Sequence, residues 1–289
     1  MMRAPILASR FFMSDSAKPT NPNKFNKNIG SIGGFIRSNY SESREVIVFL
    51  GDVARATTRL IFNPSRMRWN DLFYYMNLCG SQALPIVAMI CLLMGLIMGF
   101  QGAVLLRTYG AELYIADLVG FTILKEMGPL MVAMISTGRA GSAFAAEIGT
   151  MKINEEINAL STMGIEPVRM LVVPKLLAMI VVIPLLTVFG DICGVFGGFI
   201  VGTGLMGIPM AAYYERTVRV LTLSAFNIGI IKSVVFAIII ALVGCYRGFQ
   251  SSADAQGVGR ATTSSVVISI FIIVVADAVM TVLCYVLGY

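Results

Sequence analysis

Five long apolar runs constrain the fold of this chain more than any other feature of its sequence. A helix needs about 20 mostly apolar residues to cross a hydrocarbon core of roughly 30 Å. Soluble domains average about 45–50% apolar and about 25% charged residues, whereas this chain has 57% and 13%. The sequence therefore predicts an all-α membrane protein with five transmembrane helices, at 83–106, 118–137, 171–206, 225–246 and 265–287.

The run at 171–206 is long enough for two short crossings, since its 36 residues would extend about 54 Å as one helix. Glycines at every fourth position favour a single helix, because a turn near Asp191 would interrupt their stripe. Such a stripe lets a neighbouring helix approach closely. We therefore expect one long span, with a helix-packing face formed by Gly190, Gly194, Gly198 and Gly202.

The chain before the first span divides into two parts. Residues 1–41 are polar and basic without apolar periodicity, and we expect them to form a flexible tail. Residues 42–82 predict an amphipathic helix in the membrane interface and a segment leading into the transmembrane domain at 83–289. Packing of that helix on the protein's own cytoplasmic face is the alternative. Arg66 and Arg68 flank the first span, so the positive-inside rule places the N-terminus in the cytoplasm and the C-terminus on the opposite side.

Several kinds of chemistry are disfavoured by composition. The chain has no histidine, which removes histidine-based catalysis and ordinary histidine-ligated metal sites. It has no Gly-x-x-x-x-Gly-Lys-Ser/Thr phosphate loop, which disfavours ATP hydrolysis by this chain. The net charge of +6 does not indicate nucleic acid, because 11 of the 22 basic residues precede the first span, where they would face anionic lipid. We expect no catalytic residue, no bound metal and no cofactor.

Two adjacent charged residues, Lys125 and Glu126, lie within the second apolar run. Ionisable groups inside a membrane are costly and usually face a bundle interior or a wet cavity. Neighbours in a helix point about 100° apart, so these two cannot simply pair with each other. One interpretation places both near the outer interface, with Lys125 reaching toward the head groups. The other places them in a substrate cavity, with Gln101 at a similar depth.

Asp191, Lys232 and Asp277 are further ionisable residues within apolar runs. No spacing ties them together, so a structural pair, a gate and a transport role all remain open. The alternative function is an ion-coupled secondary transporter that uses Glu126, Asp191 and Asp277. Such a carrier is expected to have two related halves, which this sequence does not show.

The stretch 139–175 is polar although it lies between two apolar runs, and it carries four basic and four acidic residues. We expect a short cytoplasmic helix at 153–163, because Gly164 suits a helix C-cap and Pro167 prevents continuation. The apolar positions at helical spacing are Ile153, Ile157 and Leu160. This stripe would be buried either against the protein's own loops or in a groove on a partner.

Several short motifs occur in order along the chain. They read GRAGSA at 138–143, AEIGTM at 146–151, EEINAL at 155–160, MGIEPVR at 163–169 and GVGRATT at 257–263. Together they resemble the MlaE-type permease, the membrane subunit of ABC transporters that move lipids between bacterial membranes. The resemblance covers about 45–287.

The resemblance implies a permease of the bacterial inner membrane that moves glycerophospholipids between the inner and outer membranes, with a periplasmic C-terminus. It implies a permease homodimer, cytoplasmic ABC ATPase subunits seated on a coupling helix, a periplasmic ring of MCE-domain proteins and a small STAS-type subunit. Lys125 stands where relatives often carry arginine, which favours point-charge attraction over bidentate contact with phosphate. The implied lining of a lipid cavity between two permeases is Gln101, Leu106, Tyr109, Lys125 and Glu126. The implied ATPase-coupling residues are Ile153, Glu155, Glu156, Ile157, Leu160, Met163 and Gly164.

Overall fold

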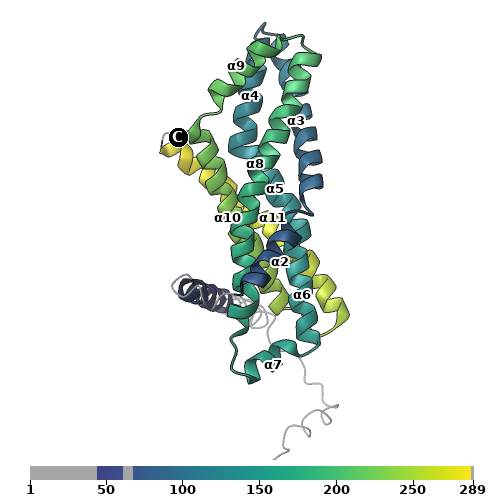
Figure 1. Ribbon diagram of the computed structural model, residues 1–289, viewed down its shortest axis with the longest axis vertical. Helices are drawn as coiled ribbons and strands as arrows, with labels where there is room; N and C mark the ends of the chain where they lie inside the picture. Colours follow the sequence, from purple (N-terminus) through teal and green to yellow (C-terminus); the bar gives the residue numbers. More distant parts are fainter. Residues whose placement is uncertain (1–43, 61–67, 288–289) are drawn as a thin grey trace, which may run out of the picture. The chain divides into compact units, whose positions relative to one another are not determined.

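The computed structural model describes residues 44–60 and 68–287. Within these ranges every regular element is a helix and none is a strand. Five helical stretches are long and apolar enough to cross a membrane (Figure 1), so the predicted all-α fold with five transmembrane helices is confirmed. The stretches are Trp69–Arg107, Glu112–Ile153, Val168–Gly204, Leu223–Phe249 and Ala255–Val286. The predicted tail at 1–41 lies outside the described residues.

The elements follow one another as a series of helices. A helix at 44–60 comes first among the described residues. The first span comprises α2 (Trp69–Cys79) and α3 (Leu84–Arg107). The second comprises η2 (Glu112–Tyr114), α4 (Ile115–Thr122), η3 (Ile123–Met127), α5 (Gly128–Ser136), η4 (Thr137–Gly141) and α6 (Ser142–Ile153). Next come α7 (Glu156–Thr162), η5 (Val168–Val172), α8 (Val173–Gly204), α9 (Met210–Val220), α10 (Leu223–Phe249) and α11 (Ala255–Val286).

The second span continues well beyond residue 137, where its apolar run ends in the sequence, and stops at Ile153. Its last helix, α6, stays regular because one side of it is packed: Phe144 and Ile148 are fully buried. Gly149 on the same helix lies so close to Val258 of α11 that a Cβ there would be 3.1 Å from a valine methyl group. The polar sequence after residue 137 therefore marks a change in the surface of the helix, not its end.

The third span is one helix. α8 runs without interruption through Val173–Gly204, so the prediction of a single long span across 171–206 is confirmed. Two of its glycines, Gly194 and Gly197, lie directly against the backbone of α3, whereas Gly198 and Gly202 pack against the side chains of Val119 and Tyr213. A Cβ built on Gly95 of α3 would overlap the carbonyl of Gly194, and one built on Gly197 would overlap the α3 backbone. The small-residue face of α8 is therefore the reason that these two spans can approach so closely.

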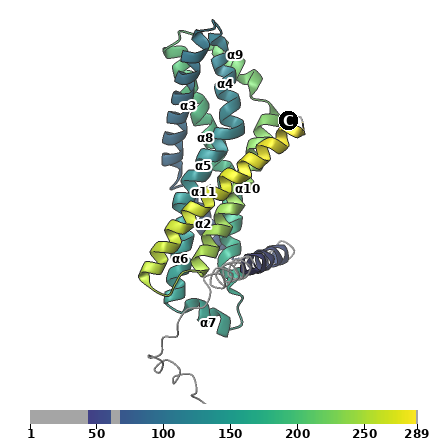
Figure 2. The same ribbon diagram turned by 180° about the vertical axis from the view of Figure 1, so that it is seen from behind.

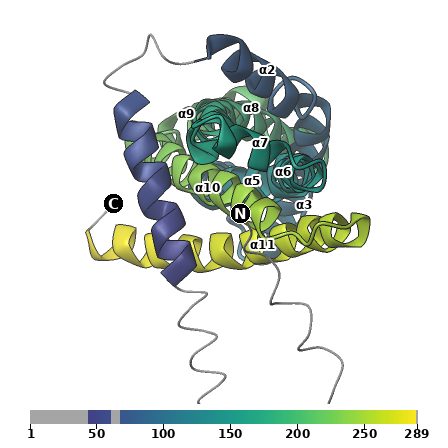
Figure 3. The ribbon, with the colours of Figure 1, turned by 90° about the horizontal axis from the view of Figure 1, so that it is seen from below.

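The short helices α7 and α9 lie at opposite ends of the helix bundle (Figure 1). At the α9 end, Arg216 donates to the carboxylate of Asp117 over 2.5 Å, which fastens α9 to α4. That hydrogen bond, with a second one involving Tyr114, raises the pKa of Arg216. α11 lies along the outside of the bundle (Figures 2 and 3) and exposes large apolar side chains such as Phe271 and Val282.

Candidate functional site

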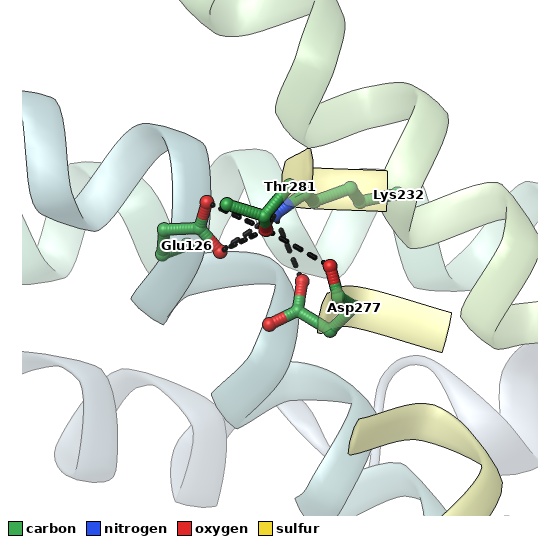
Figure 4. A network of polar contacts seen from close by, with 4 residues as sticks. All are labelled: Glu126, Lys232, Asp277 and Thr281. Carbon is green, nitrogen blue, oxygen red and sulfur yellow. Dashed lines mark hydrogen bonds and ion pairs between the residues drawn. The ribbon is translucent and has the colours of Figure 1, made fainter. Parts of the chain in front are cut away.

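An ionic cluster lies inside the membrane-spanning part of the bundle (Figure 4). Lys232 of α10 is fully buried, and its ammonium Nζ lies 2.5 Å from Glu126 Oε2 and 2.8 Å from Asp277 Oδ1. Lys232 also donates to the hydroxyl of Thr281 over 2.9 Å. We call Glu126, Lys232, Asp277 and Thr281 the intramembrane cluster. It joins three spans at one point, since Glu126 belongs to the second span and the other two partners to α11.

The cluster carries two carboxylates and one ammonium, so its formal charge is negative when all three groups are ionised. The side chains of Glu126 and Asp277 remain 28% and 17% exposed, whereas that of Lys232 is 0% exposed. The ammonium of Lys232 is therefore enclosed by protein, whereas the side chains of Glu126 and Asp277 remain partly accessible. A buried cation held by two carboxylates satisfies the usual requirement that charges within a membrane be paired.

Glu126 and its neighbour Lys125 reach the cluster region on a turn of π-helix, η3. Such turns insert one extra residue into a helix and occur often at functional sites. Lys125 points elsewhere, and its ammonium lies 4.5 Å from the centre of the Phe121 ring. The two adjacent charges are thus separated, as expected for neighbours in a helix: Glu126 joins the cluster and Lys125 rests on an aromatic face.

The other predicted cavity residues lie on the first span and the turn that follows it. Gln101 is exposed, Tyr109 is 77% exposed, and Leu106 packs against a small apolar cluster around Ile115. Among the described residues, no hydrogen bond or ion pair joins Gln101 or Tyr109 to Lys125 or Glu126. In a single chain these five residues therefore form separate surfaces and not one hydrogen-bonded site.

Sequence reasoning singled out Lys232 without a partner and grouped Asp277 with Glu126 only as ion sites of the alternative carrier. It did not pair Lys232 with either carboxylate, and it missed Thr281. The available signal was the spacing of Asp277 and Thr281, which stand four residues apart and so share one face of a helix. Asp191 lies outside the intramembrane cluster. Its carboxylate packs instead against Gly128, in the space that a side chain would fill.

The predicted short helix between the second and third spans is α7, Glu156–Thr162. Ile153 belongs to the preceding helix α6, and Glu155 turns the chain with a left-handed backbone, φ 56°. The end of α7 is a Schellman motif, in which the amides of Gly164 and Ile165 donate to the carbonyls of Ser161 and Leu160. Gly164 has φ +73°, a conformation that glycine adopts without steric cost.

The apolar stripe of this helix faces the protein itself. Leu160 is only 9% exposed, and Ile157 packs against the main hydrophobic core. Glu155, Glu156 and Gly164 are exposed, and Met163 is 65% exposed. Of the two interpretations of the stripe, burial against the protein's own chain therefore describes Ile157 and Leu160. The exposed face of α7 is the opposite one, which is mostly polar.

A second buried charge fixes the base of the segment that holds α7. Lys175, at the start of α8, is fully buried and lies 3.1 Å from Glu147 of α6. The hydroxyl of Tyr75 on α2 donates to the same carboxylate over 2.6 Å. The Lys175 ammonium also lies 5.1 Å from the centre of the Tyr75 ring and 5.7 Å from that of Phe144. We call Tyr75, Glu147 and Lys175 the basal pair network, because it ties together the helices on both sides of α7.

These features define a polytopic helical membrane protein with an ionic cluster inside its spans and a short helix outside them. The family model for the permease MlaE matches residues 72–283, which include the whole intramembrane cluster. The chain belongs to the MlaE permease family and is a non-catalytic, multi-pass membrane subunit of the ABC-transporter permease type.

Individual relatives agree with the family match. The chain is 31% identical over 249 residues to the intermembrane phospholipid transport system permease protein MlaE of Haemophilus influenzae, covering 84% of this chain and 95% of that protein. It is 37% identical over 206 residues to a probable ABC transporter permease protein of Rickettsia typhi, covering 71% and 80% of the two chains. A probable ABC transporter permease protein of Synechocystis is 31% identical over 212 residues, covering 73% and 81%.

Proposed function

We propose that this permease subunit moves glycerophospholipids between the inner and outer membranes of a bacterium, driven by a separate ATPase. The observation that carries the proposal is the similarity, over 84% of the chain, to a permease named for intermembrane phospholipid transport. The chain would reside in the inner membrane with its N-terminus in the cytoplasm and its C-terminus in the periplasm. Its partners would be cytoplasmic ABC ATPase subunits, a periplasmic ring of MCE-domain proteins and a small STAS-type subunit.

The cargo would bind between two copies of the permease. Gln101 and Tyr109 are exposed in the single chain, as residues must be if a second copy completes the cavity wall. The lipid head group would approach Lys125 and Glu126, and the acyl chains would contact Leu106. Lys125 supplies a point charge for a phosphate group. Because the side chain of Glu126 is partly exposed, the intramembrane cluster would border the same cavity.

The ATPase would act through α7. Because Ile157 and Leu160 hold the helix to the protein's own core, the ATPase would contact the outward face, which includes Glu155, Glu156 and Met163. Movement of the ATPase would then displace α7 together with the ends of α6 and α8 to which it is connected.

The variant Met163→Asp should weaken or abolish co-purification of the ATPase, because it places a charge at the most exposed apolar position on this face. The permease itself should keep its thermal stability in detergent, since Met163 contributes little to the core. The matched control is Leu205→Asp, at an equally exposed apolar position (63% against 65%) beyond the far end of α8. Retention of the ATPase at wild-type stoichiometry by Met163→Asp would show that α7 is not the contact.

The overall function is tested by purifying the tagged chain from membranes and measuring ATP hydrolysis with and without added phospholipid. We expect an ATPase to co-purify and its hydrolysis rate to change several-fold when phospholipid is supplied. An ion-coupled carrier that uses Glu126, Asp191 and Asp277 predicts the opposite result. In that case the chain alone, reconstituted in liposomes, would move its substrate in response to an ion gradient with no ATPase present.

A further inference from the structure

A pocket of about 370 Å³ lies at the α7 end of the bundle, apart from the intramembrane cluster. Its walls come from three places: Leu60 at the end of the helix at 44–60, Arg68 just before α2, and the stretch 164–177 that leads from α7 into α8. One part of the lining is apolar, with Leu60, Pro174 and Leu177. The other part carries the guanidinium groups of Arg68 and Arg169.

Among the described residues, the charges around this pocket leave one cation without a partner. Arg68 pairs with Asp71 at 3.2 Å, and Glu166, which also lines the pocket, lies 3.9 Å from Arg59. Each acidic group thus has its own arginine. Arg169 has no ion pair or hydrogen bond with any part of the chain that the structure describes, so the pocket carries a net positive charge.

The depth of the pocket in the membrane follows from the residues beside it. Trp69, Phe73 and Tyr74 begin the first span directly after Arg68 and are 50%, 61% and 61% exposed. Exposed aromatic residues at the end of a span mark the level of the lipid head groups. The arginines therefore lie at head-group level, while Pro174 and Leu177 lie further along the third span.

We propose that this pocket binds one anionic glycerophospholipid of the adjoining leaflet, with its phosphate against Arg169 and Arg68 and the start of an acyl chain on the apolar wall. A basic pocket between spans at head-group level suits an anionic lipid, and the apolar wall favours a lipid over a soluble phosphate. Because the stretch after α7 forms part of the wall, a bound lipid would hold that stretch to α2 and to the helix at 44–60. That this leaflet is the cytoplasmic one rests on the proposed orientation, but the binding itself does not.

The test is native mass spectrometry of the purified permease complex, titrated with phosphatidylglycerol or with phosphatidylcholine of the same acyl chains. We expect preferential retention of phosphatidylglycerol. The double variant Arg68→Gln, Arg169→Gln should bind it about thirtyfold more weakly, at about fivefold for each basic side chain near the head groups. The matched control Arg247→Gln, Arg260→Gln removes two charges elsewhere and should bind phosphatidylglycerol as the wild type does. Equal retention of the two lipids, or unchanged binding in the double variant, would overturn the proposal.

Three further measurements test whether the binding is specific to this pocket and to a lipid. Arg169→Lys preserves the charge without the planar guanidinium, so it should show intermediate binding even if the double variant fails to fold. Glycerol 3-phosphate should not displace the retained lipid, and displacement at equal concentration would indicate a soluble anion site instead. Lys125→Gln, which alters the proposed cargo cavity, should leave unchanged the part of this retention that depends on Arg68 and Arg169. Loss of retention in Lys125→Gln alone would assign the lipid to the cargo cavity and contradict the pocket.

Discussion

Replacing Lys232 by methionine should destabilise the folded protein by about 3–5 kcal/mol, which is the usual cost of removing one partner from a buried ion pair. The ammonium of Lys232 lies within 3 Å of the carboxylates of both Glu126 and Asp277. Its loss leaves both carboxylates in the membrane without their shared cation. Under the proposed function, lipid-dependent ATP hydrolysis should be lost as well. The measurement is unfolding of the purified protein in mixed micelles by increasing denaturing detergent, together with ATPase activity of the complex.

Two controls separate charge from packing in this experiment. The triple variant Lys232→Met, Glu126→Gln, Asp277→Asn removes every charge of the cluster and should recover most of the lost stability, because neutral replacements of a buried ion pair are often tolerated. Lys125→Met should cost only about 1 kcal/mol, since among the described residues that ammonium contacts one aromatic ring and no carboxylate. If Lys232→Met were as stable as the wild type, the intramembrane cluster would not be holding the spans together.

Replacing Gly197 by alanine should destabilise the protein by about 1–3 kcal/mol, because a methyl group there overlaps the backbone of α3 and forces α3 and α8 apart. This loss should appear although alanine favours a helix over glycine by about 1 kcal/mol. The same unfolding assay in mixed micelles measures it. Separation of these two spans should also be visible as a lower yield of monodisperse protein.

Gly204→Ala is the matched control, since it makes the same change at the end of the same helix, where a Cβ would meet nothing within 4 Å. It should be neutral or slightly stabilising. A loss of stability in both variants would point to a general requirement for glycine in α8. A loss in neither would contradict the close packing of α3 on α8.

The number of spans was predictable because apolar length is a direct requirement of the bilayer. The continuity of α8 was also predictable, since the four-residue spacing of Gly190, Gly194, Gly198 and Gly202 makes sense only on one helix. The end of the second span was not. A helix continues for as long as its backbone and one packed face allow, and buried Phe144 and Ile148 provide that face within a polar-looking sequence.

The candidate site was only partly predictable for a related reason. Sequence shows which residues are charged within a span but not which spans are neighbours, and Glu126 and Lys232 are 106 residues apart. The orientation of α7 raised the same difficulty. The spacing of Ile157 and Leu160 reveals an apolar stripe, but only the position of α7 relative to the core shows that the stripe faces inward.

The basal pair network has a mechanical consequence. Glu147 and Lys175 join the helices at the two ends of the segment that carries α7, and Tyr75 attaches the same point to the first span. The two ends of this segment are therefore held together, because α6 and α8 are joined by an ion pair. A force applied to α7 would therefore displace the second and third spans together.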